Sequence, residues 1–243
     1  MDKPIYLVAG ASRGIGFALA MQLLKQGHRV IACCRQPQWS TGSKKLAQAG
    51  ADVRSLDILI DESINNCAYG IAEDYPHLDY LINCIGTLNE KNIRPEKQLK
   101  QIKRQALHQI FDSNSFGHIL LIQALEPLLA KARQFNCISI SARVGSISDN
   151  QVGGWYSYRA SKAALNMLLK TLSIEFDRKY SGQSRVLALH PGTTDTELSK
   201  PFQNNVSWQL YSPEDTAKNL LNVITNAKQT GQFLAFDGTN IDF

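Results

Sequence analysis

Three glycines in one short turn near the start of the chain most constrain how it can fold. Residues 5–10 form an apolar, strand-like run, and Gly10, Gly14 and Gly16 follow it where a helical pattern over 14–26 begins. Glycine lets the backbone turn tightly and lets a ligand approach the peptide amides, while a helix N-terminus offers N–H groups and partial positive charge. A purely structural turn explains one glycine but not three at this spacing. The strand, turn and helix therefore predict a phosphate cradle of the kind that holds a dinucleotide.

Short aliphatic runs alternate with longer helical patterns along the rest of the chain. The expected strands lie at 5–10, 29–34, 52–57, 78–84, 135–141, 185–191 and 232–238, and the expected helices at 14–26, 41–49, 61–73, 100–132, 157–179 and 213–227. Alternation of this kind indicates a parallel sheet covered by helices on both faces. We therefore predict an α/β fold, a single doubly wound Rossmann-type domain over 1–243 with a seven-stranded, mostly parallel sheet. Its cofactor half would span roughly 1–140 and its catalytic half roughly 141–243.

Composition limits the classes of function. Of the 243 residues, 44% are hydrophobic and 19% are charged, which is ordinary for a globular protein with a substantial core. The formal net charge of +5 is spread without a basic block, so no nucleic-acid partner is indicated. No apolar run approaches the roughly 20 residues that cross a bilayer, and no secretory signal is visible. The five scattered cysteines lack zinc-ligand spacing, so we expect a reduced, cytoplasmic protein with no metal site and no membrane partner.

The end of the second expected strand indicates which dinucleotide the glycine turn would bind. NAD-binding proteins usually place a carboxylate there to bond the ribose 2′-hydroxyl, but this strand ends in Cys34 and Arg35. Arg13, inside the glycine turn, would lie close to Arg35 in such a fold. Because guanidinium groups bind a 2′-phosphate with paired hydrogen bonds, we expect NADP(H) in preference to NAD(H). The alternative is that Arg35 is an ordinary surface residue.

A tyrosine and a lysine in the helical pattern 157–179 suggest acid–base chemistry. Tyr158 and Lys162 are four residues apart and share a helix face, whereas Tyr156 points elsewhere. A free tyrosine, with a pKa of about 10, holds its proton too tightly for rapid exchange at neutral pH. A nearby lysine and an oxidised nicotinamide would lower the pKa of Tyr158, which could then act as general acid in reduction and general base in oxidation. The alternative is a surface tyrosine and a solvated lysine.

With these features the chain resembles the short-chain dehydrogenase/reductase family over essentially its whole length. The segment VAGASRGIG looks like the family's cofactor turn, and NCIG at 83–86 stands where the family has its Asn-Asn-Ala-Gly loop. FDSNSFG offers the family's helix asparagine, YRASK carries the Tyr–Lys pair, and HPGTTDTELS is similar to the Pro-Gly segment near the nicotinamide. SARVGSISDN and FDGTNIDF look most like the C-factor and sniffer-type carbonyl reductases.

The resemblance implies roles for particular residues. The catalytic residues would be Asn114, Ser141, Tyr158 and Lys162, with Asn114 holding a water and Lys162 also bonding the nicotinamide ribose. Asn114 could instead be a polar helix residue that satisfies backbone groups. The family also implies a small carbonyl or alcohol substrate and a homodimer or homotetramer. The expected cofactor contacts are Gly10, Ser12, Arg13, Gly14, Ile15, Gly16, Arg35, Asp57, Ile58, Asn83, Cys84, Ile85, Gly86, Tyr158, Lys162, Pro191, Gly192, Thr193, Thr194 and Thr196.

The chain departs from the family's pattern at the serine and at the head of the glycine turn. The family's catalytic serine lies three residues before a glycine, and counting back from Gly145 puts Ala142 there, with Ser141 one residue earlier. Adjacent strand residues point to opposite faces, so Ser141 reaches the site only through a one-residue shift or a bulge. We favour Ser141, with Ser146 or no serine as alternatives. Ala9 replaces a threonine, which removes a hydroxyl that braces the loop.

The leading hypothesis is an NADPH-dependent carbonyl reductase (EC 1.1.1.-) that converts an aldehyde or ketone to an alcohol. An alcohol dehydrogenase that runs oxidatively is a second possibility, and a C-factor-like dinucleotide-binding signalling or regulatory protein with weak or no catalysis is a third. Trp155 stands where enoyl reductases of the superfamily carry their tyrosine, which disfavours reduction of carbon–carbon double bonds. Residues expected to border an apolar or aromatic substrate are Leu88, Val152, Trp155, Phe202, Trp208 and Leu210.

Overall fold

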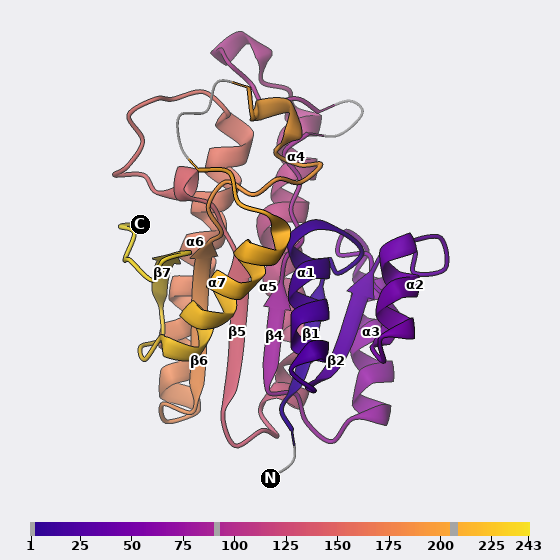
Figure 1. The fold of residues 1–243 in the computed structure, drawn as a ribbon. Helices are drawn as coiled ribbons and strands as arrows, with labels where there is room; N and C mark the ends of the chain where they lie inside the picture. The colour runs from indigo at the N-terminus through magenta and orange to yellow at the C-terminus, as the bar shows by residue number, and fades with distance from the viewer. Residues whose placement is uncertain (1–2, 90–92, 205–208) are drawn as a thin grey trace.

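The computed structural model describes residues 3–89, 93–204 and 209–243. Seven strands form one sheet in the order β3-β2-β1-β4-β5-β6-β7, and every neighbouring pair is parallel (Figure 1). The predicted α/β, doubly wound fold is confirmed, with a sheet that is wholly rather than mostly parallel. The strands are β1 (Ile5–Ala9), β2 (Arg29–Cys34), β3 (Asp52–Ser55), β4 (Tyr80–Asn83), β5 (Phe135–Ile140), β6 (Ser184–His190) and β7 (Gln232–Ala235).

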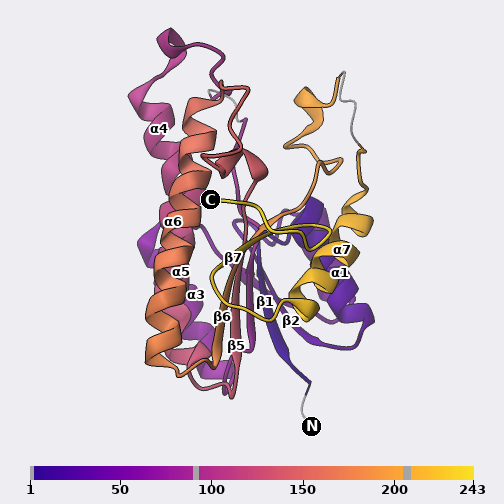
Figure 2. The same cartoon turned by 90° about the vertical axis from the view of Figure 1, so that its left-hand side faces the viewer.

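Helices cover both faces of the sheet, as Figure 2 shows edge-on. Helices α1, α2 and α7 pack on one face, and α3, α5 and α6 on the other. Among the described residues, none of the helices combines the length and apolarity needed to cross a membrane. The helices are α1 (Gly14–Lys25), α2 (Thr41–Gln48), α3 (Asp61–Asp74), α4 (Arg104–Phe111), α5 (Gly117–Leu129), α6 (Tyr156–Lys179) and α7 (Pro213–Asn226), with short turns η1 (Leu99–Gln101), η2 (Asp112–Phe116), η3 (Arg143–Gly145) and η4 (Lys200–Phe202).

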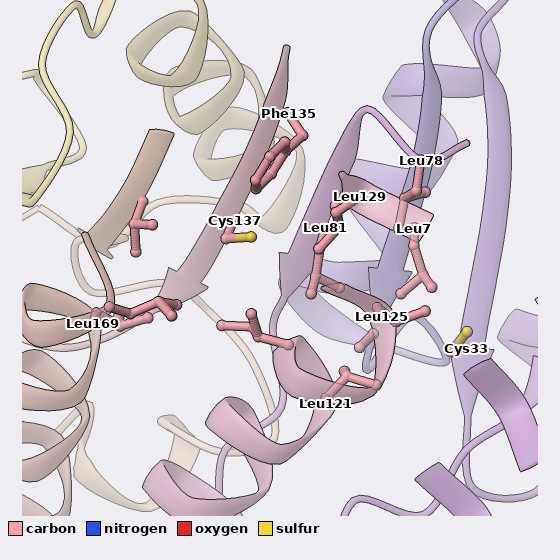
Figure 3. Close-up of a cluster of buried hydrophobic side chains, with 14 of the residues drawn as sticks. Leu7, Cys33, Leu78, Leu81, Leu121, Leu125, Leu129, Phe135, Cys137 and Leu169 are labelled. Atoms are coloured by element: carbon pink, nitrogen blue, oxygen red, sulfur yellow. The ribbon is translucent and has the colours of Figure 1, made fainter. Parts of the chain in front are cut away.

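The central strands are buried on both faces, because the sheet lies between two apolar layers. In β1, Leu7 and Ala9 pack toward α5, while Tyr6 and Val8 pack toward α1. Figure 3 shows Leu7 in the layer that lies against α5. A strand with two apolar faces reads as a continuous hydrophobic run, which is why the sequence pattern located these strands.

The helix expected over 100–132 is interrupted in the structure. It begins with the short turn η1, continues as α4, widens into the π-helical turn η2 and resumes as α5. A π-turn inserts an extra residue into the helix and changes the direction of the side chains it carries. Close packing accompanies the change, since a Cβ on Gly117 would lie 2.5 Å from Ile58 Cγ1. Hydrophobic periodicity alone gave no sign of this turn.

The two edge strands differ: the returning chain covers β7, whereas β3 carries a charged cluster. At β3, the Arg54 guanidinium pairs with the carboxylates of Asp52 and Asp74. At β7, the chain turns back along the strand: Ala235 N–H donates to Thr239 O and Ile241 N–H donates to Phe233 O, each over 2.8 Å. The strand expected over 232–238 therefore ends at Ala235, where this return begins.

Candidate active site

The glycine turn after β1 lies against two other segments at the carboxyl edge of the sheet. Gly10 has φ +79°, and a Cβ there would lie 3.1 Å from Ile85 N in the loop after β4. Gly14 has φ +56°, and its Cβ would lie 3.3 Å from Thr196 Cγ2 in the segment after β6. A Cβ on Gly16 would lie only 2.4 Å from Gly10 O. All three glycines are therefore required by local geometry, and they bring three predicted cofactor segments together.

The two arginines expected to bind a 2′-phosphate are placed at this same edge. Gly10 N–H donates to Cys33 O over 2.9 Å, which ties the glycine turn to the end of β2. Arg13 and Arg35 are both exposed. Within residues 3–89, 93–204 and 209–243, neither guanidinium has a carboxylate partner. Both cations are therefore available to an anionic ligand.

Asp57 and Ile58, two of the expected cofactor contacts, have different surroundings. Asp57 Oδ1 accepts a hydrogen bond from Leu59 N–H over 3.1 Å and so shapes the turn before α3. The Ile58 side chain is buried in the core and packs on Gly117. Ile58 could therefore contact a cofactor through its backbone, but not through a side chain that belongs to the core.

A buried histidine, His118, forms a hydrogen bond with the backbone of the loop that follows β4. Asn83 Oδ1 accepts from Ile85 N–H over 3.0 Å, and Ile85 O accepts from His118 Nε2–H over 2.9 Å. Because a carbonyl can only accept, the proton lies on Nε2, and Nδ1 accepts from the Ser139 hydroxyl over 3.1 Å. Burial lowers the pKa of His118 to about 3, so its ring is neutral. His118 was not among the residues predicted from sequence, although a histidine within the apolar run of α5 was a visible signal.

Tyr158 and Lys162 lie together in the first turns of α6, as predicted. The exposed fractions of their side chains are 8% and 2%, and the Lys162 Nζ lies 6.0 Å from the centre of the Tyr158 ring. Lys162 Nζ donates to Ile140 O over 2.9 Å, and burial lowers the pKa of Lys162 to about 7. Burial raises the pKa of Tyr158 to about 12. The lowering expected for Tyr158 thus needs a further positive charge at the site and stays a prediction.

Asn114 lies beside the lysine, within the π-helical turn η2. Its amide bonds both backbone groups of Thr87, accepting from N–H over 2.6 Å and donating to O over 2.8 Å. It also donates to the Ser161 hydroxyl over 3.1 Å. A Cβ on Gly86 would lie 3.5 Å from Lys162 Nζ and 3.7 Å from Asn114 Oδ1, so all three residues meet. Asn114 therefore does satisfy backbone groups, while its expected water remains a prediction.

Ser141, expected to be the catalytic serine, directly follows β5 and contacts α6. Its N–H donates to Leu189 O over 2.8 Å, so the ladder between β5 and β6 continues through this residue without a shift or a bulge. Its hydroxyl donates to Asn166 Oδ1 over 2.7 Å, one helical turn beyond Lys162. The alternative, Ser146, accepts from Asp149 N–H over 3.2 Å. The hydroxyl proton of Ser141 is thus directed to α6, and a catalytic role for Ser141 stays a prediction.

The segment after β6 is braced by its own hydrogen bonds. Gly192 has φ +74°, and the N–H of Tyr211 donates to Thr193 O over 2.9 Å. The Thr194 hydroxyl lies 2.9 Å from that of Thr216 on α7. Among the predicted cofactor residues here, Thr194 thus stabilises the segment itself.

Only part of the expected substrate border comes together. The Trp155 ring lies 4.9 Å from that of Phe202 and 6.1 Å from that of Tyr158, centre to centre. Leu88 is buried, whereas Val152 is 89% exposed and stands apart from any enclosed surface. Leu210 is also exposed. Trp208 lies outside the described residues.

The fold and the buried Tyr–Lys pair beside a glycine turn are those of a dinucleotide-dependent oxidoreductase, and comparison with known proteins agrees. A family model for short chain dehydrogenases matches residues 4–207, so the chain belongs to that family. It is 34% identical over 236 residues to 1-hydroxy-2-glutathionyl-2-methyl-3-butene dehydrogenase of Rhodococcus sp. (strain AD45), covering 96% of each chain.

Solved structures give the same result. NADPH-bound carbonyl reductase from chicken fatty liver matches with a TM-score of 0.88 at 26% identity, covering 100% of this chain and 95% of that one. The carbonyl reductase Sniffer of D. melanogaster shares the fold at 24% identity, with a TM-score of 0.86 and 100% of both chains covered. The family resemblance expected from the sequence motifs is confirmed, and sniffer-type reductases are among the structural neighbours.

Proposed function

We propose that the protein is an NADPH-dependent carbonyl reductase (EC 1.1.1.-). The observation that carries the proposal is the buried Tyr158–Lys162 pair at the carboxyl edge of the sheet, the edge that also carries the glycine turn. In open α/β sheets, ligands bind at this edge, near the point where the strand order reverses. Here the order reverses between β1 and β4. The NADPH bound by the chicken carbonyl reductase supports the choice of cofactor.

The residues at this edge fit such a cofactor. The glycine turn and the N-terminus of α1 offer N–H groups to a pyrophosphate, and side chains larger than glycine would clash with the neighbouring segments that shape the turn. Arg13 and Arg35 would hold the 2′-phosphate, because both are exposed and lack a carboxylate partner within the described residues. When bound, NADPH supplies the hydride that reduces the carbonyl carbon.

The chain's own side chains would handle the proton. Tyr158 would donate its hydroxyl proton to the carbonyl oxygen as negative charge develops there. Lys162, with a pKa lowered to about 7, can release or take up a proton near neutral pH and so restore the tyrosine. Asn114 holds the backbone of Thr87 beside the lysine and keeps this part of the site rigid. We leave Ser141 out of the catalytic set, because its hydroxyl bonds Asn166.

The test is NADPH oxidation by purified protein with a panel of aliphatic and aromatic aldehydes, ketones and diketones. We expect the wild type to turn over at least one of these compounds. Tyr158→Phe should abolish turnover while still binding NADPH, and Ser141→Ala should retain most of the turnover. Faster oxidation of alcohols with NADP⁺ than reduction at matched concentrations would favour an alcohol dehydrogenase. Tight NADPH binding without turnover of any compound would favour a regulatory role instead.

We also propose a homodimer or homotetramer formed through the outward faces of α5 and α6. Monomeric proteins rarely expose contiguous apolar surface, so apolar side chains that gather on neighbouring helices support a contact. Those exposed here on the π-turn, α5 and α6 are Phe116, Leu120, Met167 and Ile174.

A further inference from the structure

A buried carboxylate, Glu96, contacts helix α6, which carries the proposed catalytic residues Tyr158 and Lys162. Glu96, in the loop between β4 and α4, is only 4% exposed. Its Oε2 accepts from Ser157 N–H over 3.1 Å, and its Oε1 accepts from the Ser157 hydroxyl. Within the described ranges no lysine, arginine or histidine pairs with it. A buried carboxylate without a cationic partner is costly, so these hydrogen bonds are what stabilise it there.

The contact falls where helix α6 lacks a cap of its own. The first N–H groups of a helix have no partner within the helix, and a Ser, Thr, Asp or Asn before it usually bonds one of them. Here that position is Trp155, whose side chain cannot do so. Glu96 reaches Ser157 across 61 positions of sequence and bonds the N–H that a local cap would serve.

The same glutamate also holds the backbone that leads into the helix. Gly153, Gly154 and Trp155 have φ of +69°, +65° and +53° in succession. The left-handed region is unfavourable for a tryptophan, so surrounding contacts must hold it there. Trp155 N–H donates to Glu96 O, and the Trp155 ring packs against those of Tyr158 and Phe202.

We infer that Glu96 is a positioning residue: its carboxylate fixes the first turn of α6 beside the Trp155 that its backbone carbonyl holds, and so sets the place of Tyr158 relative to the substrate. The inference rests on the proposed function, since it assigns Tyr158 the proton transfer. Tyr158 directly follows Ser157, so any displacement of Ser157 moves the tyrosine hydroxyl with it. Because proton transfer depends steeply on geometry, a small displacement lowers turnover more than it lowers cofactor binding.

The other end of α6 provides a matched control. Glu126, on α5, accepts from the Tyr180 hydroxyl over 2.7 Å and from Lys179 Nζ over 2.7 Å, where α6 ends. Glu126→Ala thus removes a carboxylate that secures the same helix far from Tyr158. If Glu96→Ala lowered kcat only because α6 was weakened as a whole, Glu126→Ala would lower kcat by a similar factor.

The experiment measures kcat, KM and the Kd for NADPH in both variants, together with Glu96→Gln. We expect Glu96→Ala to lower kcat by about tenfold or more with the NADPH Kd within about twofold of the wild type. Glu96→Gln should recover most of kcat, because its amide oxygen can accept from Ser157 N–H while its NH₂ donates to the hydroxyl. Glu126→Ala should keep at least about half of kcat. Unchanged kcat in Glu96→Ala, or an equal loss in Glu126→Ala, would overturn the inference.

A second readout does not depend on turnover. Amide hydrogen exchange of the segment 155–160 should speed up in Glu96→Ala and not in Glu126→Ala. If the wild type reduces no carbonyl compound, the proposed function fails, and this exchange result still decides whether Glu96 holds the helix start. If Glu96→Ala does not fold, Ser157→Ala takes its place and should raise the same exchange with a smaller loss of kcat. Unchanged exchange in the folded variants would refute the role of Glu96.

Discussion

The neutral, buried His118 should make the folded protein sensitive to acid. Burial lowers the pKa of His118 from its ordinary 6.5 to about 3. At pH values between about 3 and 6.5, the histidine is protonated in the unfolded chain and neutral in the folded protein. The stability contribution of the neutral ring is therefore fully present above pH 6.5 and is lost as the pH falls toward 3.

The magnitude follows from the pKa difference. Each pH unit in that window costs about 1.4 kcal/mol, so at pH 4.5 the loss from this residue is about 2.7 kcal/mol. Several kilocalories are a large fraction of the stability of a typical domain, about 5–15 kcal/mol. Protonation also turns Nδ1 into a second donor, so it could no longer accept from the Ser139 hydroxyl.

Urea unfolding of the wild type and His118→Gln at pH 7.0 and pH 4.5 tests this. Glutamine can still donate to Ile85 O but does not titrate, so its stability should fall by about 2–3 kcal/mol less than that of the wild type between the two pH values. His190, whose pKa burial lowers to about 4, and the carboxylates are common to both proteins and cancel in the comparison. The same loss of stability in both proteins would refute the assignment of acid sensitivity to His118.

Three further changes have expected outcomes. Asn83 Nδ2 is buried without a partner within the described residues, and Ala9 is the residue that pairs with Asn83 between β1 and β4. A serine hydroxyl at position 9 could accept from Asn83, so Ala9→Ser should raise the free energy of unfolding by about 1 kcal/mol. Ala9→Val adds no hydroxyl and should give no such gain. Arg35→Asp should raise the Kd for NADPH by about tenfold or more and leave that for NADH nearly unchanged; equal effects on both would exclude a 2′-phosphate contact. Met167, 67% exposed on α6, should be part of the proposed oligomer contact, so Met167→Glu should reduce the mass measured by light scattering, and an unchanged mass would remove this face from the proposal.

Apolar runs and glycine spacing predicted most of the fold and the glycine turn after β1. A strand such as β1 is buried on both faces and therefore appears in the sequence as an uninterrupted aliphatic run. Gly10 and Gly14 have positive φ, which few other residues adopt, so the glycines in the sequence marked where the backbone turns. The spacing of Tyr158 and Lys162 likewise predicted that the two side chains share one helix face, because a helix turns by a fixed amount per residue.

What the sequence could not predict depends on contacts between distant residues. The partner of Ser141 is Asn166, and nothing local indicated that its hydroxyl would be taken up by α6. Glu96 and Ser157 meet only because the loop after β4 folds over the start of α6. The π-turn around Asn114 lies inside a segment whose apolar pattern predicted one continuous helix.

The covered β7 edge of the sheet limits how copies of this protein can associate. An unpaired strand edge is a template for another chain, and open edges lead to aggregation and fibrous growth. Here the return of the chain over Phe233 and Ala235 occupies the hydrogen-bonding groups of β7, and the charged cluster around Arg54 marks the β3 edge. The sheet therefore cannot lengthen from one molecule to the next at β7, which is consistent with the helix-face contact proposed above.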